Sequence, residues 1–284
     1  MKPSAQQIKK FQKTVWDYYH TSGRGQLPWR TSINPYRIWV SEIMLQQTQV
    51  DRVINFFKLW MKSFPTIQKL AQASQVDVLK HWKGLGYNSR ALRMKQAAGI
   101  IMKDYRGKFP TDYQELKKLP GIGPYTAGAI CAFANNQPVV LIETNIRRVF
   151  IYHFFQTMDS VHDEDILKLI EKTVDQDNPR EWYWALMDYG SFLGRTLNSN
   201  GKKYNPNQQS KHYTKQKKFT GSDRQIRGKI LEFLLKNKKT DLHDLINHLQ
   251  DISKDTQRIE KVINQLEREG FTTKNKNNSI FLKK

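Results

Sequence analysis

The stretch that decides the fold is LPGIGPYTAGAI, residues 119–130. Gly121 and Gly123 permit a tight turn with exposed backbone amides, because glycine adopts backbone conformations that other residues avoid. A helical stretch precedes this turn and another begins after it, and the start of a helix carries a partial positive charge. The segment therefore has the features of a turn between two helices that can bind a phosphate.

The first two thirds of the chain read as a succession of helices. Apolar residues return every three or four positions, with short breaks at proline, glycine or aspartate, and no alternation typical of strands is evident. The stretches with this pattern are residues 8–19, 36–57, 66–83, 89–105 and 113–118. We expect a mainly α-helical fold, and a chain of 284 residues can bury one large core or two modest ones.

The charge of the chain indicates a polyanionic partner. The formal net charge is +21, and phosphate backbones are the commonest polyanion that a basic protein meets. Nucleic acid is therefore the leading partner, although a ribosome-associated protein or a lysine-rich compositional bias would give the same charge.

Cysteine content and hydropathy exclude other classes. The one cysteine, Cys131, rules out a disulfide within the chain and any site built from several cysteines, and its apolar neighbours predict a buried thiol. The N-terminus lacks the apolar stretch of a signal peptide, and no run of about eighteen apolar residues occurs. We expect a cytoplasmic protein that does not enter a membrane.

The C-terminal third changes character twice. Residues 197–221 are rich in lysine, asparagine and glutamine and contain no acidic residue, which predicts a basic linker. Residues 222–284 then show a helix after Ser222, helices over 242–249 and 256–269, and a hairpin of 271–273 and 279–282 with a turn at 274–278. This outline predicts a winged-helix-like α+β domain, with a small helical cap on the first domain as the alternative.

The hairpin stretch resembles the helix-hairpin-helix of the endonuclease III superfamily of base-excision DNA glycosylases, in which LPGIG is followed by Thr-Ala. The resemblance implies a glycosylase domain over 1–196, with a six-helix barrel subdomain at about 29–137 and a second helical subdomain from both flanks. It places the linker at 197–221 and the winged-helix-like domain at 222–284. Bifunctional members carry a lysine nucleophile where this chain has Tyr125. Tyrosine has no amine for a Schiff base, so a monofunctional glycosylase is implied. We still expect Tyr125 to be a catalytic residue, with an aromatic that packs on the hairpin as the alternative.

Two further stretches, LPWR at 27–30 and NPYRIWVSEIMLQQTQV at 34–50, resemble the catalytic helix of adenine glycosylases. Glu42 lies among apolar residues of this helix, where desolvation raises the pKa of a carboxylic acid toward neutrality. By resemblance, Glu42 protonates the departing adenine. The alternative is a surface glutamate paired with a residue four positions away, but Ile38 and Gln46 carry no charge.

A second carboxylate, Glu143, lies in VVLIETNIRRV at 139–149. The family has aspartate before Gly-Asn here, where it stabilises the sugar cation or captures it covalently and helps to deliver water. This chain has Glu143 and Thr144 instead, and the added methylene moves the carboxylate on a scale to which catalysis is sensitive. We expect a catalytic Glu143, with a glutamate that only stabilises a helix N-terminus as the alternative.

The remaining site residues follow from the same resemblance. GLGYNSR at 84–90 and WALMDYG at 184–190 match family positions that open the duplex and line the adenine pocket. The expected DNA-binding residues are Gln47, Thr48, Leu85, Tyr87, Arg90, Gly121 and Gly123, and the expected base pocket is Trp29, Arg30, Leu45 and Asp188. A core role for Tyr87 and a solvated basic face for Arg90 are the alternatives.

The resemblance covers residues 8–195. Beyond it most members carry four cysteines that hold an iron–sulfur cluster and a C-terminal domain that recognises oxidised guanine, and this chain has neither. We therefore expect no cofactor and no metal site, with a monovalent or divalent cation at the hairpin as the open alternative. The winged-helix-like tail would then read the lesion, bind DNA nonspecifically or contact another protein.

Together these features predict a nucleoid-associated, monomeric DNA repair enzyme. It would hydrolyse the N-glycosidic bond of adenine mispaired with 8-oxoguanine or guanine in double-stranded DNA and leave an abasic site. The alternatives are a mismatch thymine or uracil glycosylase and a catalytically silent DNA-binding protein on the same fold. Glu42 argues against the first, and the joint presence of Glu42, Gln47, Tyr87 and Tyr125 argues against the second.

Overall fold

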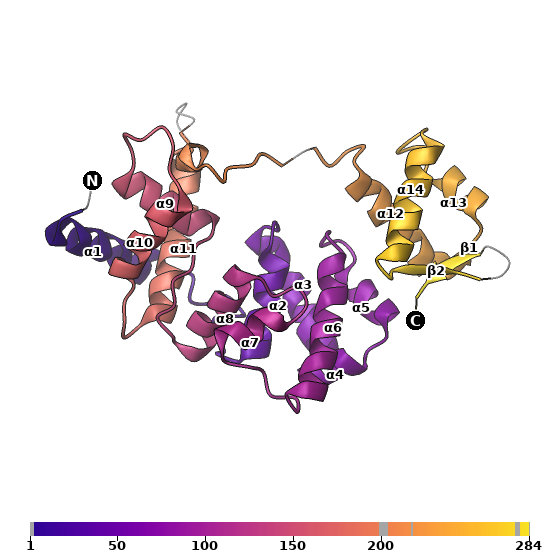
Figure 1. Cartoon of the computed structure of the whole chain (residues 1–284), viewed down its shortest axis with the longest axis horizontal. Helices are drawn as coiled ribbons and strands as arrows, with labels where there is room; N and C mark the ends of the chain where they lie inside the picture. The colour runs from indigo at the N-terminus through magenta and orange to yellow at the C-terminus, as the bar shows by residue number, and fades with distance from the viewer. Residues whose placement is uncertain (1–2, 199–203, 217, 276–278, 284) are drawn as a thin grey trace. The chain divides into compact units, whose positions relative to one another are not determined.

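The computed structural model describes residues 3–198, 204–216, 218–275 and 279–283 and divides into two compact units. Unit 1 contains Met1–Gln46 with Phe109–Lys215, and unit 2 contains Gln47–Lys108 with Gln216–Lys284. Helices dominate both units (Figure 1), so the mainly α-helical prediction is confirmed. The predicted domain boundaries stay predictions, because packing into compact units is a different property from independent folding.

Unit 1 is built from helices with one short 3-10 turn, η1. These elements are α1 (Ala5–Ser22), α2 (Pro35–Leu45), α7 (Tyr113–Lys118), α8 (Pro124–Asn135), α9 (Thr144–Phe154), α10 (Asp163–Thr173), α11 (Pro179–Thr196) and η1 (Pro206–Gln209). Helix α2 packs on α8, and α11 packs on both α1 and α9. Among the described residues of the chain, no helix is long and apolar enough to cross a membrane.

Aromatic side chains hold α1, α9 and α11 together. Phe11 of α1 meets Phe150 of α9 with ring centroids 5.2 Å apart and Trp182 of α11 at 6.0 Å. Gly190 of α11 lies so close to α9 that an added Cβ would sit 2.4 Å from the backbone oxygen of Asn145. Only glycine permits this approach, which places the N-terminus of α9 against α11.

Unit 2 combines four helices of the first half of the chain with the C-terminal segment. The helices are α3 (Val50–Ser63), α4 (Ile67–Gln72), α5 (Gln75–Trp82) and α6 (Ser89–Asp104). The C-terminal elements are α12 (Asp223–Asn237), β1 (Lys239–Thr240), α13 (Leu242–His248), α14 (Thr256–Arg268), β2 (Thr272–Lys274) and β3 (Ile280–Leu282).

The two longest predicted helices are each divided in the structure. The pattern over 36–57 predicted one helix, but α2 ends at Leu45 and α3 begins at Val50. The pattern over 66–83 likewise separates into α4 and α5, where Ser74 caps α5 by accepting a hydrogen bond of 3.0 Å from the backbone of Asp77. These predictions were wrong because apolar periodicity continues across short breaks that contain neither glycine nor proline.

The C-terminal helices and hairpin are confirmed, and β1 is an addition that the sequence did not predict. The sheet is antiparallel in the order β1-β3-β2, with Thr240 opposite Ile280 and Thr273 opposite Phe281. Part of the predicted turn at 274–278 lies outside the described residues. The core of this segment also includes Leu79 of α5 and Leu92 of α6, so it packs on the helices of its own unit. Its designation as a winged helix stays a prediction.

Part of the predicted linker is structured. Asn207 donates a hydrogen bond of 3.1 Å to the carbonyl of Thr144 at the start of α9, and Gln209 donates one of 2.6 Å to the carbonyl of Met158. Val161 and Ser210 form an isolated β-bridge. Side-chain amides thus fix this part of the predicted linker to neighbouring backbone without any apolar periodicity, and the linker assignment stays a prediction.

Candidate active site

A buried carboxylic acid on α2 meets a phenol at the start of α8. Asn34 caps α2 by accepting a hydrogen bond of 2.9 Å from the backbone of Tyr36, and α2 places Glu42 with only 6% of its surface exposed. Tyr125 lies in the first turn of α8 and donates its hydroxyl hydrogen to Oε2 of Glu42 at 2.7 Å. The structure thus joins two predicted catalytic residues that are 83 positions apart.

Burial changes the protonation of this pair. The pKa of Glu42 is raised to about 7, chiefly by desolvation; the hydrogen bond from Tyr125 and the charge of Arg30 oppose the rise, and the negative charge of Glu143 contributes to it. Burial and the neighbouring carboxyl groups hold the pKa of Tyr125 well above its usual value. At neutral pH, Tyr125 therefore stays a hydrogen-bond donor, and Glu42 is present in both its acid and its carboxylate form.

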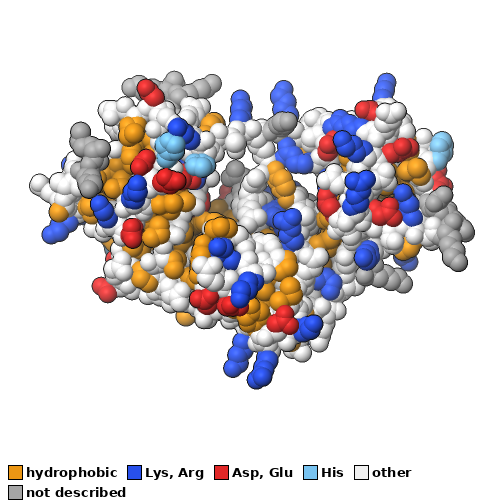
Figure 2. Space-filling model, in the orientation of Figure 1, with side chains coloured by type: hydrophobic (Ala, Val, Ile, Leu, Met, Phe, Trp, Pro, Cys, Tyr) orange, Lys and Arg blue, Asp and Glu red, His pale blue; other side chains and the backbone are white. Residues whose placement is uncertain are grey.

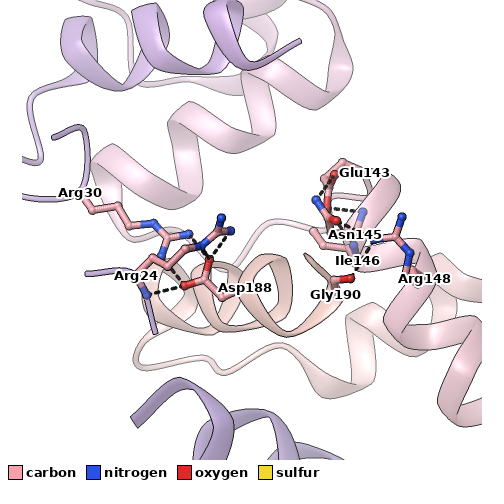
Figure 3. A network of polar contacts seen from close by, with 8 residues as sticks. All are labelled: Arg24, Arg30, Glu143, Asn145, Ile146, Arg148, Asp188 and Gly190. Carbon is pink, nitrogen blue, oxygen red and sulfur yellow. Dashed lines mark hydrogen bonds and ion pairs between the residues drawn. The ribbon is translucent and has the colours of Figure 1, made fainter. Parts of the chain in front are cut away.

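Glu143 is the N-cap of α9. Its Oε1 accepts hydrogen bonds from the backbone amides of Asn145 at 2.7 Å and Ile146 at 2.8 Å, and its Oε2 accepts one from the Asn145 side chain at 3.2 Å (Figure 3). Burial raises the pKa of Glu143, while these two amides and the charges of Arg148 and Arg147 act against that rise. Glu143 therefore caps α9, as the alternative predicted, and its negative charge contributes to the raised pKa of Glu42.

The capping residues are themselves held in place. Arg148 donates hydrogen bonds of 2.8 Å to the Asn145 side-chain oxygen and to the carbonyl of Gly190 (Figure 3). The close approach at Gly190 thus fixes Asn145, which in turn fixes Glu143. Arg148 and Asn145 both lie within residues 139–149, but nothing in the pattern of the sequence indicated that they position Glu143.

Asp188 is fully engaged in ion pairs. Arg30 donates two hydrogen bonds to it, at 2.7 and 3.0 Å, and Arg24 adds one from its backbone and one from its side chain, both at 2.8 Å (Figure 3). Burial alone would raise the pKa of Asp188, but the two arginines outweigh burial and hold it below its usual value. This carboxylate therefore fastens the segment of residues 24–30 to α11. Nothing in the pattern of the sequence indicated Arg24.

The predicted base-pocket residues lie in the same unit as Glu42. Trp29 and Arg30 are buried, Leu45 is partly exposed, and the Arg30 guanidinium lies 5.2 Å from the ring centre of Trp184. Arg30 and Asp188 contact each other, and they also contact Trp184 and Arg24 respectively. Their direct contact with a base stays a prediction.

The hairpin between α7 and α8 has the predicted form. Gly121 is exposed and has φ of 80°, a left-handed conformation that favours glycine. Gly123 is the N-cap of α8, and a Cβ there would meet nothing within 4 Å. The turn therefore leaves open space in front of the first amides of α8, where an anion can bind.

The predicted duplex-opening residues belong to unit 2. Gln47 and Tyr87 have φ values of 55° and 47°, which is strained for residues with a side chain, and Tyr87 is 38% exposed. Leu85 is buried and Thr48 is partly exposed. Exposed side chains held in an unfavourable backbone conformation are typical of functional positions.

Arg90 lies inside unit 2, so the alternative of a solvated basic face is wrong. It is 9% exposed and donates hydrogen bonds to the carbonyls of Gly86 at 3.0 Å and Leu85 at 3.3 Å. Burial lowers its pKa to about 10. Its observed contacts hold the turn that presents Tyr87, and its phosphate contact stays a prediction.

The residues present do not fit an iron–sulfur cluster. Such a cluster needs several thiolate ligands, and the one cysteine, Cys131, is buried in α8 with its pKa raised by desolvation. Over the part of the chain that the structure describes, His, Cys, Asp and Glu side chains form no group of three or more that could hold a metal ion. The predictions of no cofactor and of an alternative cation at the hairpin stay predictions.

This chain resembles known proteins in both sequence and structure. Residues 40–176 match the family model of HhH-GPD superfamily base excision DNA repair proteins. The adenine DNA glycosylase of Mycobacterium tuberculosis is 35% identical over 236 residues, which cover 76% of each chain. The adenine DNA glycosylase of Buchnera aphidicola subsp. Baizongia pistaciae is 39% identical over 196 residues, which cover 68% of this chain and 54% of that relative.

This chain spans about half the length of the Buchnera relatives that it matches. Among solved structures, a thermostable thymine-DNA glycosylase superposes with a TM-score of 0.59 at 24% identity over 66% of this chain and 87% of the other. A non-covalent endonuclease III–DNA complex gives a TM-score of 0.55 at 20% identity over 71% of this chain and 91% of the other. At these identities the likeness establishes the fold.

Proposed function

Because the chain belongs to the HhH-GPD superfamily of base excision DNA repair proteins, we propose that it is an adenine-specific DNA glycosylase. It hydrolyses the N-glycosidic bond of adenine mispaired with 8-oxoguanine or guanine and leaves an abasic site. The observation that carries this proposal is the buried Glu42, whose pKa is about 7. Its carboxyl group accepts a hydrogen bond of 2.7 Å from the Tyr125 hydroxyl. Curated relatives named adenine DNA glycosylase support it.

Glu42 acts as the general acid. Neutral adenine is a poor leaving group, and protonation of a ring nitrogen lets it accept the electron pair of the breaking bond. A carboxylic acid with its ordinary pKa would be almost wholly ionised at neutral pH, whereas Glu42 retains its proton in a large fraction of molecules. After transferring this proton, Glu42 is a carboxylate and can accept one from the attacking water.

Glu143 stabilises the positive charge that develops on the sugar. Its carboxylate is fixed by the first backbone amides of α9. Its negative charge contributes to the raised pKa of Glu42, so an anion and an acid act in one site. This division of roles is the one that glycoside hydrolysis requires. The capping geometry of α9 fixes where the carboxylate of Glu143 lies.

Tyr125 restricts the reaction to base removal. Its hydroxyl is committed to Glu42, and its raised pKa keeps it protonated, so it supplies neither an amine nor a phenolate nucleophile. Strand cleavage through a Schiff base therefore has no nucleophile at this position. The enzyme is monofunctional and leaves an abasic site for alkali or another enzyme to cleave.

Double-stranded DNA is the partner. The net charge of +21 favours a polyanion, and lysine and arginine side chains stand out from the visible face of the protein (Figure 2). The hairpin at Gly121 and Gly123 offers helix-start amides to a phosphate. Tyr87 and Gln47 enter the stack when adenine is extruded, because the flat face of tyrosine can replace a base.

The test is single-turnover cleavage of an end-labelled duplex that contains adenine opposite 8-oxoguanine, with alkali treatment to reveal abasic sites. We expect cleavage at the adenine only after alkali, and its loss in Glu42→Gln. Glu171→Gln is the matched control, because Glu171 is an exposed residue of α10. Absence of cleavage by folded protein that binds the duplex would refute adenine excision, and cleavage without alkali would refute the monofunctional mechanism.

A further inference from the structure

Unit 2 contains a groove that the active site does not use. Its volume is about 1030 Å³, at the upper end of the range for small-molecule sites. One wall is the turn of residues 83–89 between α5 and α6, and the other is the segment that leads into α12 with the first turns of that helix. The groove therefore joins the predicted duplex-opening residues to the C-terminal segment.

The groove brings three flat groups close together. The Arg224 guanidinium lies 5.6 Å from the ring centre of Tyr87 and 6.0 Å from that of Phe219. Tyr87 is 38% exposed and Phe219 is 57% exposed, although large apolar rings are usually buried. Aromatic rings and guanidinium planes that remain open to solvent are the surfaces on which nucleobases stack.

Polar groups of the C-terminal segment contact both Tyr87 of the turn and Gln47, which lies between α2 and α3. Gln216 donates from its side-chain amide to Oε1 of Gln47 at 2.9 Å and to the hydroxyl of Tyr87. Arg224 donates to the same hydroxyl at 2.8 Å. The groups that would reach a base beside Tyr87 are thus an arginine fork and an amide, which suit the O6 and N7 acceptors of guanine.

The rim of the groove is basic. Two glutamates, Glu232 and Glu269, face six cationic side chains, which are Arg52, Lys83, Arg93, Arg224, Arg227 and Lys229. Glu232 pairs with Lys83 at 2.9 Å, and Glu269 pairs with Arg227. The excess of positive charge favours the phosphates on either side of a bound base.

We propose that this groove binds the guanine-type base that faces the excised adenine, and that Arg224 and Gln216 determine the specificity for that base. The proposal rests on the proposed glycosylase function. A residue that fills the gap left by an extruded base lies next to the base that remains, and Tyr87 and Gln47 form one wall of the groove. The C-terminal segment thereby reads the opposite base. Ordinary guanine offers Arg224 both O6 and N7 as acceptors, whereas oxidised guanine carries a hydrogen on N7, which the side-chain oxygen of Gln216 can accept while Arg224 keeps O6.

The experiment measures binding without turnover. Duplexes carry a stable abasic analogue opposite guanine, 8-oxoguanine or cytosine, and fluorescence anisotropy gives their dissociation constants. We expect the wild type to bind both guanine-type duplexes more tightly than the cytosine duplex. Arg224→Ala should reduce this preference about 10-fold, the size expected for loss of a bidentate base contact. Arg224→Lys should not restore it, because lysine keeps the charge but lacks the planar fork.

Matched variants separate base reading from general attraction. Arg268→Ala removes an exposed arginine of the same unit that does not line the groove, so it should leave the preference unchanged. Phe219→Leu should weaken binding to duplexes with an unpaired base more than to fully paired DNA. Thermal midpoints confirm folding, and Gln216→Ala provides the same test from a second, exposed side chain if an Arg224 variant does not fold.

The outcomes distinguish this proposal from the glycosylase assignment. A wild type that shows no preference for guanine-type duplexes, or an Arg224→Ala loss that is equal for all three duplexes, would overturn the base-reading groove even if adenine is excised. A wild type that shows the preference, loses it with Arg224→Ala and excises no adenine would support the groove and overturn the proposed reaction.

Discussion

Replacing the buried acid Glu42 with glutamine should stabilise the folded protein at alkaline pH. The pKa of Glu42 is about 7 in the folded state and 4.5 as its ordinary value, chiefly because of burial. Folding therefore favours the protonated form, so the contribution of Glu42 to stability is full below pH 4.5 and is lost as the pH rises toward 7. The gap between the two pKa values corresponds to about 3 kcal/mol.

The assay is urea denaturation of the wild type and Glu42→Gln at pH 5 and pH 8. Glutamine carries no charge at either pH, so any change caused by its amide cancels in the difference between them. We expect the gain in unfolding free energy to be about 2 kcal/mol larger at pH 8 than at pH 5. The exposed Glu171→Gln control should show no such difference. An equal gain at both pH values would refute the claim that burial holds Glu42 protonated.

Three further predictions concern the same unit. Tyr125→Phe removes a hydrogen bond that lowers the pKa of Glu42. The midpoint pH at which single-turnover excision declines should therefore rise by about one unit. An unchanged or lower midpoint pH would contradict Glu42 as the general acid and Tyr125 as its hydrogen-bond donor. Asp188→Asn leaves the buried Arg30 charge without its partner and should cost about 3–5 kcal/mol in denaturant unfolding, and a loss below about 1 kcal/mol would argue against the ion pair as an anchor. Gly190→Ala forces a methyl group to within 2.4 Å of a backbone oxygen at the start of α9, so excision and the thermal midpoint should both fall, and retention of both would contradict the close approach.

Local features of the site were accessible from the sequence. The hairpin at 119–130 was predicted because its glycines and the following helix start act within a few residues. The raised pKa of Glu42 was predicted from its apolar neighbours on one helix, and the structure confirms it. The capping position of Glu143 was recognised as an alternative for the same reason, since a cap bonds amides two and three residues ahead.

Breaks between helices were less accessible. The polar run that separates α2 from α3 contains neither glycine nor proline, and the apolar spacing continues on its far side. The chain turns there because α2 and α3 bury their apolar faces in different units. Apolar periodicity predicts that a residue is buried, but it does not predict in which of two cores the residue packs.

What the sequence by itself determined is the helical fold, the hairpin and the identity of the acid, because each depends on neighbours within one or two turns of the chain. Only the tertiary structure decided how those groups are held. Arg24 donates a hydrogen bond to Asp188, which is 164 positions away in the sequence, and Gln216 donates one to Gln47, which is 169 positions away. Such partners leave no periodic trace, because a hydrogen bond depends on where two side chains meet in space and not on their separation along the chain.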